Sequence, residues 1–492
     1  MQARNTTRKH GPQAGIALLI SIFILLLISV VAIALIVASG TESAMAGNYR
    51  TATGVYYAAL AGLEEARGRL LSRNPTSFKR TAPTLIPTPL LVGQPVYIIN
   101  PVAGENVAPW DPASNYPDTE FNPEFLSSGF ALPNPSPSTN SVSTVAGIQG
   151  PSFKWVRINA VSEASLNLDV DNDANKDQTT PIYYDGVKLN TTSTGFQVFE
   201  ITSFAILANG SQKLLQYLVA PVPINFPVVP LTSLPALTIA GSTANGVVFN
   251  APTSVGYYVS GVDLATVPFC AAGPPVPAIG VFDGSDRTTV RNGIPTADQP
   301  NYTGSAAVPD VEVSGAFGAL QTPSQFDALA QSIAQSADVV YPSGPTTYPL
   351  TTVTGSTLSA QTAGMISSNP MTVVINGNLD LNGWHYTGYG LLLVTGNLNY
   401  DPDASWQGMV LVIGQGTVTG SRAGSGEFDG AFIAAKTRDA AGNLLPDPNL
   451  GTASVNFAPG MGGVGMRYSS CWVKKAMPIA NCKILSFREI PQ

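Results

Sequence analysis

Hydrophobic residues run almost without interruption from Ile16 to Gly40, near the start of the chain. A helix of roughly 25 residues is about 37 Å long, which is enough to cross the hydrocarbon core of a bilayer. Arg4, Arg8 and Lys9 precede this run, and the first charge after it is Glu42. Since basic flanks stay on the cytoplasmic side, we expect a single-pass membrane protein whose C-terminal part is exported.

The pattern of hydrophobic positions changes after this run. From Met45 to Leu70 apolar residues recur at alternating steps of four and three, with charged residues between them. This spacing predicts an amphipathic helix that continues the membrane helix and has one packing face. The sequence Ala44-Met45-Ala46 also matches a signal-peptide cleavage pattern, so removal of the whole apolar run is an alternative.

Strand patterns follow a segment rich in Pro, Ser, Thr and Asn. Phe153 to Val161 alternates, and an apolar run from Phe196 to Leu207 is joined to another, Lys213 to Val219, through Asn209-Gly210. Asn-Gly between apolar runs predicts a β-hairpin, because both residues tolerate the positive φ of a tight turn. We therefore expect residues 75–225 to form an antiparallel sheet that packs on the amphipathic helix.

A different periodicity governs residues 226–492. Short apolar runs followed by glycine recur at spacings of roughly 20 residues, a length that suits one rung of a solenoid. The clearest are Val373–Leu379, Leu392–Leu398 and Val410–Gly416, continued by Phe432 and begun by Leu237–Gly241 with Tyr258–Gly261. The pattern predicts a parallel β-helix, and a β-sandwich with evenly spaced strands is the alternative. The fold class is therefore α+β.

A short helix is expected to interrupt this β-rich region. Thr322 is suited to an N-cap, Pro323 to the first helical position, and Gln325 to a capping box. Phe326 and Ile333 then lie on one apolar face, which predicts a helix packed on the sheets or covering their open end.

Composition narrows the classes of function. Only 11% of the 492 residues are charged, and Gly and Pro number 47 and 40, which is typical of turn-rich β structure. The net charge is -7 and basic residues cluster only at the extreme N-terminus, so we expect no nucleic-acid partner.

Few residues suited to catalysis or to soft metals are present. The chain has two histidines, His10 and His385, so we expect neither a Ser-His-Asp arrangement nor a zinc site, and we predict that the protein is not an enzyme. A β-helix enzyme that cleaves polysaccharides would use acidic and basic residues, for which the candidates are Asp380, Asp401, Asp403 and Arg422. Their spacing in the sequence does not indicate a catalytic site. Cys471 and Cys482 are close enough in the chain to predict a disulfide in an exported protein, with Cys270 simply buried.

One acidic segment suggests a hard cation. Oxygen-bearing side chains alternate at Asp169, Asp171, Asp173, Asn175 and Asp177. Such spacing predicts a calcium loop, although Ala174 stands where an EF-hand needs Gly and Thr180 stands where it needs Glu. A solvated acidic loop without a cation is the alternative.

Three segments of the first 75 residues carry a resemblance to a known family. They are Gly15-Ile16-Ala17-Leu18-Leu19-Ile20, then Thr41-Glu42-Ser43-Ala44-Met45-Ala46-Gly47-Asn48-Tyr49-Arg50, and Tyr56-Tyr57-Ala58-Ala59-Leu60-Ala61-Gly62-Leu63-Glu64-Glu65-Ala66. Together they resemble type IV pilins, most closely the PilX-type minor pilins. The resemblance implies a leader of residues 1–15 that a prepilin peptidase removes by cutting between Gly15 and Ile16. It also implies a membrane and stalk helix over 16–74 and a pilin-like α+β head over 75–225.

The resemblance further implies a function in pilus assembly. Its partners would be other major and minor pilins, the inner-membrane assembly machinery and the prepilin peptidase. The protein would lie in the bacterial inner membrane with its head in the periplasm, and then on the cell surface within the pilus. Ordinary pilins carry Glu at the fifth mature position, where this chain has Ile20, which favours a place at or near the pilus tip.

An adhesive function is the alternative. A single-pass, membrane-anchored β-helix that does not polymerise would bind a glycan or another surface through aromatic residues. Those nearest together in the sequence are Trp384, Tyr386, Tyr389 and Trp406.

Overall fold

A computed structural model describes most of the 492 residues. The described residues are 13–71, 90–102, 104–111, 113–121, 125, 139–141, 152–176, 179–192, 195–223, 234–254, 256–264, 272–314, 320–463 and 465–491. The predicted calcium ligand Asp177, and Cys270, lie outside them.

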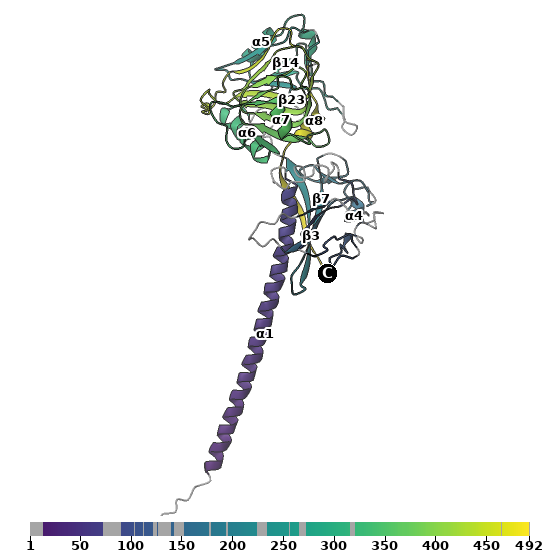
Figure 1. Cartoon of the computed structure of the whole chain (residues 1–492), viewed down its shortest axis with the longest axis vertical. Coiled ribbons are helices and arrows are strands. Elements are labelled where there is room, and N and C mark those ends of the chain that lie inside the picture. Colours follow the sequence, from purple (N-terminus) through teal and green to yellow (C-terminus); the bar gives the residue numbers. More distant parts are fainter. Residues whose placement is uncertain are drawn as a thin grey trace, which may run out of the picture.

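The predicted N-terminal helix is present as one element. Helix α1 spans Gln13–Arg69, and its 57 residues correspond to a rod of about 86 Å. Figure 1 shows the apolar half of α1 projecting away from the rest of the protein, while its C-terminal half lies along the first β domain. The second β domain lies beyond the end of α1, at the far side from the apolar half (Figure 1).

The first β domain, which we call the head, contains a six-stranded sheet. The strand order is β2-β1-β3-β7-β8-β26, and all neighbours are antiparallel except the parallel pair β1 and β2. The bounds are β1 Val96–Ile99, β2 Thr139–Ser141, β3 Phe153–Ala160, β7 Phe199–Ile206, β8 Gln212–Pro223 and β26 Ile479–Ile490. The predicted hairpin is confirmed, because β7 and β8 pair directly and Gly210 has a φ of 85° in the turn.

Side chains on the two faces of this sheet have different neighbours. Leu215, Tyr217 and Val219 of β8 pack with α1, whereas Leu218 and Ala220 face the opposite side. The opposite side carries the short helix α4, Glu163–Leu166, and a small sheet in the order β5-β4-β6. The bounds of its strands are β4 Tyr183–Tyr184, β5 Leu189–Asn190 and β6 Phe196–Gln197.

The C-terminal strand corrects the predicted domain boundary. Residues 226–492 were expected to form one β-rich domain, but β26 pairs with β8 over most of its length. Residues between β8 and β26 therefore form a domain inserted between two neighbouring strands of the head sheet. Strand pairing over such a large sequence separation leaves no local signal in the sequence, which is why the pattern of residues did not reveal it.

The inserted domain is built from two sheets whose named strand pairs are all parallel. One follows the order β13-β11-β25-β23-β21-β19-β17-β15, with β9, β12 and β14 joined to it through β23, and the other follows β10-β24-β22-β20-β18-β16. From β15 to β25 successive strands alternate between the two sheets. The bounds in chain order are β9 Leu237–Ala240, β10 Val247–Asn250, β11 Tyr258–Ser260, β12 Ile279–Val281, β13 Tyr302–Thr303, β14 Val311–Val313, β15 Val339–Tyr341, β16 Thr352–Thr354, β17 Met371–Ile375, β18 Asn378–Asp380, β19 Thr387–Val394, β20 Leu398–Tyr400, β21 Ser405–Gly414, β22 Thr417–Gly420, β23 Glu427–Lys436, β24 Ala453–Phe457 and β25 Gly465–Arg467.

The apolar repeats of the sequence stack in register. Val373 of β17 lies opposite Leu392 of β19, Leu392 opposite Val410 of β21, and Val410 opposite Phe432 of β23. The run at Leu237 does not begin this series, because β9 pairs with β23 at its last member. The first strands of the inserted domain therefore extend the stack beyond its C-terminal repeats.

Four α-helices lie within the described part of the inserted domain. They are α5 Gly284–Asn292, α6 Pro323–Ser336, α7 Gly355–Gln361 and α8 Ser470–Ala476. The predicted helix is confirmed as α6, whose N-cap Thr322 and Gln325 form a capping box. Phe326, Leu329 and Ile333 of α6 are buried in the core that the parallel sheets share.

Candidate functional site

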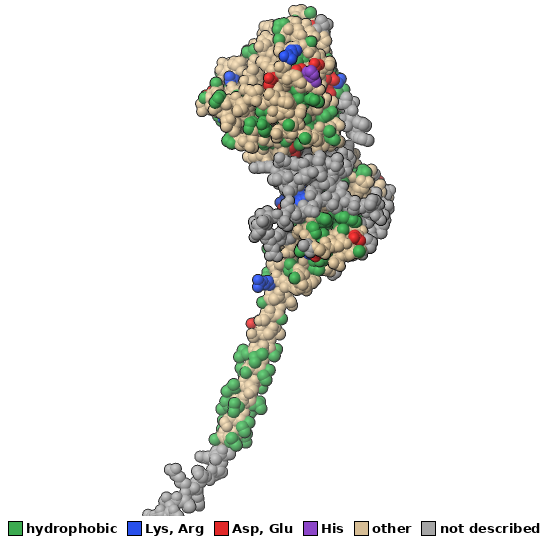
Figure 2. Space-filling view, in the orientation of Figure 1, with side chains coloured by type: hydrophobic (Ala, Val, Ile, Leu, Met, Phe, Trp, Pro, Cys, Tyr) green, Lys and Arg blue, Asp and Glu red, His purple; other side chains and the backbone are tan. Residues whose placement is uncertain are grey.

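Apolar side chains surround the N-terminal half of α1. The large apolar side chains between Ile16 and Val37 are exposed, and Figure 2 shows hydrophobic atoms on the surface of this part of the rod. The helix is long and apolar enough to cross a membrane, and none of its most apolar stretch is buried within the protein. Each large apolar side chain left in water forgoes roughly 1.5–3 kcal/mol. This half of α1 therefore requires lipid or other apolar helices around it.

The predicted cleavage and membrane-span residues all lie within α1. Gly15 and Ile16 are close to its N-terminal end, and Gly40 follows the exposed apolar segment. Ile20 is 54% exposed on the surface of the helix.

The packing stripe of α1 is only partly covered. Ala59, Leu63 and Ala66 are buried against β3, β7 and β8, as the periodicity predicted. Met45 and Tyr49, which continue the same stripe, are 71% and 76% exposed. The head thus covers the C-terminal part of the stripe, and the N-terminal part is left exposed by the described residues.

Charged residues fix the C-terminal end of α1 on the head. Arg67 pairs with Glu64 at 2.5 Å and donates to the carbonyl of Cys482 in β26 at 3.5 Å. Arg69 is buried and pairs with Glu65 at 2.7 Å. These contacts connect the stalk helix to the last strand of the chain.

The predicted Cys471–Cys482 disulfide is wrong. Cys482 is buried in the core between the head sheet and α1 and takes part in no disulfide, whereas Cys471 is disulfide-bonded and belongs to α8 of the inserted domain. Proximity in sequence was misleading because the chain leaves the inserted domain between these two residues. Burial raises the pKa of the Cys482 thiol to about 12.

The acidic segment brings together a different set of carboxylates from the alternating positions 169–177 that the sequence predicted. Three carboxylate oxygens lie within 4.8 Å of one another, one each from Glu163, Asp169 and Asp171. Asp173 does not belong to this group, and its Oδ1 accepts from the backbone N–H of Asn175 at 2.7 Å. Sequence reasoning missed Glu163, although its place at the start of a capped helix directly after a buried strand was a usable signal.

His385 lies beside two of the aspartates considered for catalysis. Its Nε2 is 3.9 Å from an oxygen of Asp401 and 3.8 Å from one of Asp403. His385 is exposed, Asp401 accepts from the N–H of Gly383 at 2.6 Å, and Asp403 accepts from that of Ser425 at 2.8 Å. Both carboxylates therefore already accept hydrogen bonds from backbone N–H groups, and the trio contains no buried polar atom that lacks a hydrogen-bond partner.

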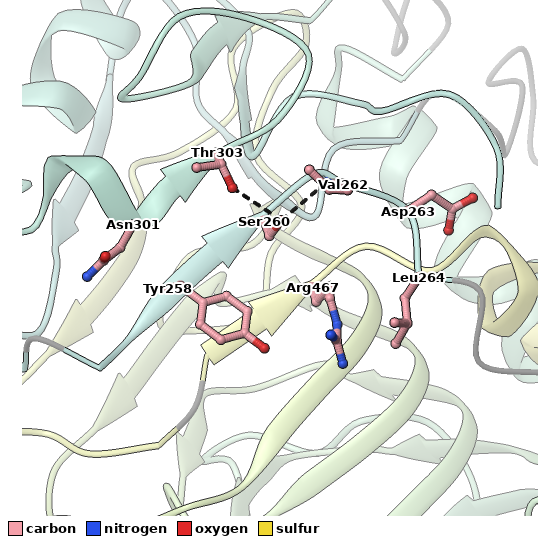
Figure 3. Close-up of a pocket in the computed structure, with 8 residues that line it drawn as sticks. All are labelled: Tyr258, Ser260, Val262, Asp263, Leu264, Asn301, Thr303 and Arg467. Atoms are coloured by element: carbon pink, nitrogen blue, oxygen red, sulfur yellow. Dashed lines mark hydrogen bonds between the residues drawn. The ribbon is translucent and has the colours of Figure 1, made fainter.

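An open pocket of about 490 Å³ lies on the inserted domain (Figure 3). Its lining residues come from β11, β13, β25 and the adjoining loops, and are Tyr258, Ser260, Val262, Asp263, Leu264, Asn301, Thr303 and Arg467. In Figure 3 Thr303 and the N–H of Val262 both donate to the Ser260 hydroxyl, each at 3.3 Å. The lining thus combines the hydroxyl groups of Ser260 and Thr303 with the Tyr258 ring and the apolar side chains of Val262 and Leu264.

The positive charge of this pocket is paired with carboxylates. Arg467 lies 2.8 Å from Glu427 and 3.3 Å from Asp429, and the Tyr258 hydroxyl donates to Glu427. Burial, followed by the hydrogen bond to Glu427, raises the pKa of Tyr258. Since Arg467 has two carboxylate partners and Asp263 also lines the pocket, the pocket offers no strong anion site.

The predicted aromatic patch is not a surface feature as a whole. Trp384 and Trp406 are only 4% and 3% exposed and belong to the main core of the inserted domain. Tyr389 packs against Trp472, so Tyr386, at 66% exposure, is the member that solvent reaches most. The sequence identified aromatic residues but could not separate those that fill the core from those that face solvent.

The sequence matches no protein-family model, and neither a curated protein nor a solved structure matches it.

Proposed function

We propose that this chain is a minor pilin of the type IV pilus, anchored in the bacterial inner membrane before assembly and then incorporated at or near the pilus tip. There it would help to start assembly or make contact with a surface. The observation that carries this proposal is the division of α1 into an exposed apolar half and a half that packs on an antiparallel sheet. A plain membrane anchor needs only the apolar half.

The uncovered stripe of α1 supports lateral packing with other subunits. Met45 and Tyr49 continue the face that buries Ala59 and Leu63 in the head, yet they are exposed in the single chain. In a bundle of similar helices this segment and the apolar residues before it would be buried against neighbours. The free energy gained from that burial would favour polymerisation.

Ile20 supports a unique position in the filament. A mature chain beginning at Ile16 has an N-terminal ammonium, and a subunit without a nearby carboxylate leaves that charge unpaired when α1 enters an apolar core. Glu42 lies more than twenty residues away along the helix and cannot substitute. A subunit at the tip packs against fewer neighbouring subunits than one in the shaft, which favours the tip position for this chain.

The inserted domain would be the displayed part of the protein. We propose that its alternating parallel strands form a β-solenoid, in which each rung buries its apolar residues by stacking on the next. Its attachment through β8 and β26 holds it beyond the end of α1, away from the membrane half (Figure 1).

The mature N-terminus tests this function. The full-length protein, extracted from membranes of cells that assemble pili, is expected to begin at Ile16 by intact mass and N-terminal sequencing. Gly15→Val is expected to leave the leader in place. Gly40→Val is the matched control, because a Cβ at Gly40 meets nothing within 4 Å, and it is expected to be processed normally. A mature chain that begins at Gly47 or Met1 would contradict the proposal.

A second function rests on the pocket of Figure 3. A non-polymerising, membrane-anchored adhesin would use the hydroxyl-rich lining around Ser260 and Thr303 and the ring of Tyr258 to bind a neutral glycan. This function predicts glycan binding without prepilin processing, so the N-terminus separates the two proposals.

A further inference from the structure

Glu163 is a buried carboxylate with an unpaired oxygen. It is the first residue of α4, on the face of the head sheet opposite α1, and it is 0% exposed. Oε1 accepts from the backbone N–H groups of Val170 and Asp171 at 2.7 and 3.1 Å. Oε2 is buried and has no hydrogen-bond partner among the described residues. A buried carboxylate that lacks a compensating partner is strongly unfavourable, so we expect a cation to bind at this oxygen.

Two further carboxylates converge on Glu163. Asp169 and Asp171 follow in the loop after α4, and an oxygen from each lies within 4.8 Å of a Glu163 oxygen and of the other. Asp169 accepts from the N–H groups of Asn172 and Ala174, at 2.8 and 3.1 Å, so the loop is wound around its side chain. Within the described part of the chain neither Glu163 nor Asp169 has a Lys or Arg partner.

The dimensions and chemistry fit one class of ion. Calcium binds oxygens at roughly 2.3–2.6 Å, so oxygens around one calcium ion are at most about 5.2 Å apart, which accommodates the observed cluster. Three carboxylates without nitrogen or sulfur ligands suit a hard cation. Magnesium demands near-octahedral geometry and retains several waters, which fits poorly beside a fully buried oxygen.

We propose that Glu163, Asp169 and Asp171 form a calcium-binding site on the head. The ion neutralises the carboxylates and joins α4 to the loop that follows it. Thr191 donates to Asp171 at 3.4 Å, so the bound ion also connects this loop to the segment after β5. The site stands apart from α1 and is independent of the function proposed above.

Calorimetry and thermal unfolding of the full-length protein in detergent micelles, first treated with EDTA, test this site. Calcium chloride alone is the ligand. The wild type is expected to bind one ion at this site and to unfold at a higher temperature in calcium than in EDTA. Glu163→Gln retains an oxygen for the Val170 N–H and is expected to weaken calcium binding by roughly tenfold or more.

Asp173→Asn is the matched control, because Asp173 is exposed in the same loop but outside the cluster. It is expected to bind calcium as the wild type does. In EDTA Glu163→Gln is expected to unfold at a higher temperature than the wild type, because it removes an uncompensated buried charge, and in calcium the order should reverse. This reversal also shows that the variant folds.

Three results would overturn the proposal. Calcium could leave the unfolding temperature of the wild type unchanged at millimolar concentration. Glu163→Gln and Asp173→Asn could affect binding equally. Magnesium chloride at the same concentration could raise the unfolding temperature as much as calcium does, which would refute the assignment to calcium.

Discussion

Gly62 of α1 packs tightly against the head sheet. A Cβ at this position would lie 2.2 Å from the Ser203 hydroxyl oxygen, 2.9 Å from Val156 Cγ2 and 3.0 Å from Phe153 Cγ. All three neighbours are buried in β3 and β7, so they cannot move aside without disturbing the core. By contrast, a Cβ at Gly47 meets nothing within 4 Å.

The two glycines therefore predict opposite effects of the same substitution. Alanine gains up to about 1 kcal/mol of helix propensity at either position. At Gly62 the closest approach of the added Cβ is only 2.2 Å, so overpacking is expected in the upper part of its usual range, at about 2–3 kcal/mol. We therefore expect Gly62→Ala to destabilise the contact between α1 and the sheet by about 1–2 kcal/mol net. Gly47→Ala should leave that contact unchanged.

Cys482 provides a local measure of this contact. Its side chain forms no disulfide and is buried in the core that α1 and the sheet share, so a thiol reagent reacts with it only when this core opens. For rapid opening and closing, a loss of 1–2 kcal/mol increases the labelling rate roughly 5- to 30-fold. Mass spectrometry of the unreduced full-length protein measures that rate. Equal labelling of Gly62→Ala and Gly47→Ala would refute the packing of α1 described here.

Three further predictions concern buried charges and cysteines. Arg157→Ala leaves two buried carboxylates without their cation, so we expect a loss of roughly 3–5 kcal/mol in urea unfolding of the head. Burial, followed by the charge of the nearby Asp283, raises the pKa of Asp286 to about 6. The contribution of Asp286 to stability therefore falls as the pH rises from about 4 to 6. In thermal unfolding we expect Asp286→Asn to stabilise the protein by up to about 3 kcal/mol at pH 7 but not at pH 4. Peptide mapping without reduction is expected to recover the Cys482 peptide without a disulfide-linked partner.

Each of these predictions has a contradicting result. Unchanged unfolding of Arg157→Ala would mean that the ion pairs contribute nothing to the head. An effect of Asp286→Asn that is the same at both pH values would show that this carboxyl does not titrate between them. A peptide containing Cys471 linked to Cys482 would overturn the separation of the two residues described above.

Local patterns predicted much of the fold. The turn at Asn209-Gly210, the cap at Thr322 and the stacked runs at Val373, Leu392 and Val410 all depend on residues near one another in sequence, and the structure contains each of them. Such features follow from backbone preferences and from the period of hydrophobic residues, which a sequence displays directly.

Non-local features could not be predicted in the same way. The return of β26 to β8, and hence the insertion of a whole domain, depends on pairing between strands separated by most of the chain. The same return separates Cys471 from Cys482. Burial of Trp384 and Trp406, and the approach of Glu163 to Asp169, are likewise decided by tertiary packing rather than by local pattern.

Photocrosslinking from the apolar half of α1 tests the central claim most directly. A photoreactive phenylalanine analogue at Phe23, which is 67% exposed, is introduced in cells that are assembling pili. We predict crosslinks to the apolar N-terminal helices of other pilus subunits. Crosslinks to lipid alone, in cells with growing filaments, would contradict the proposal that this helix packs among pilins.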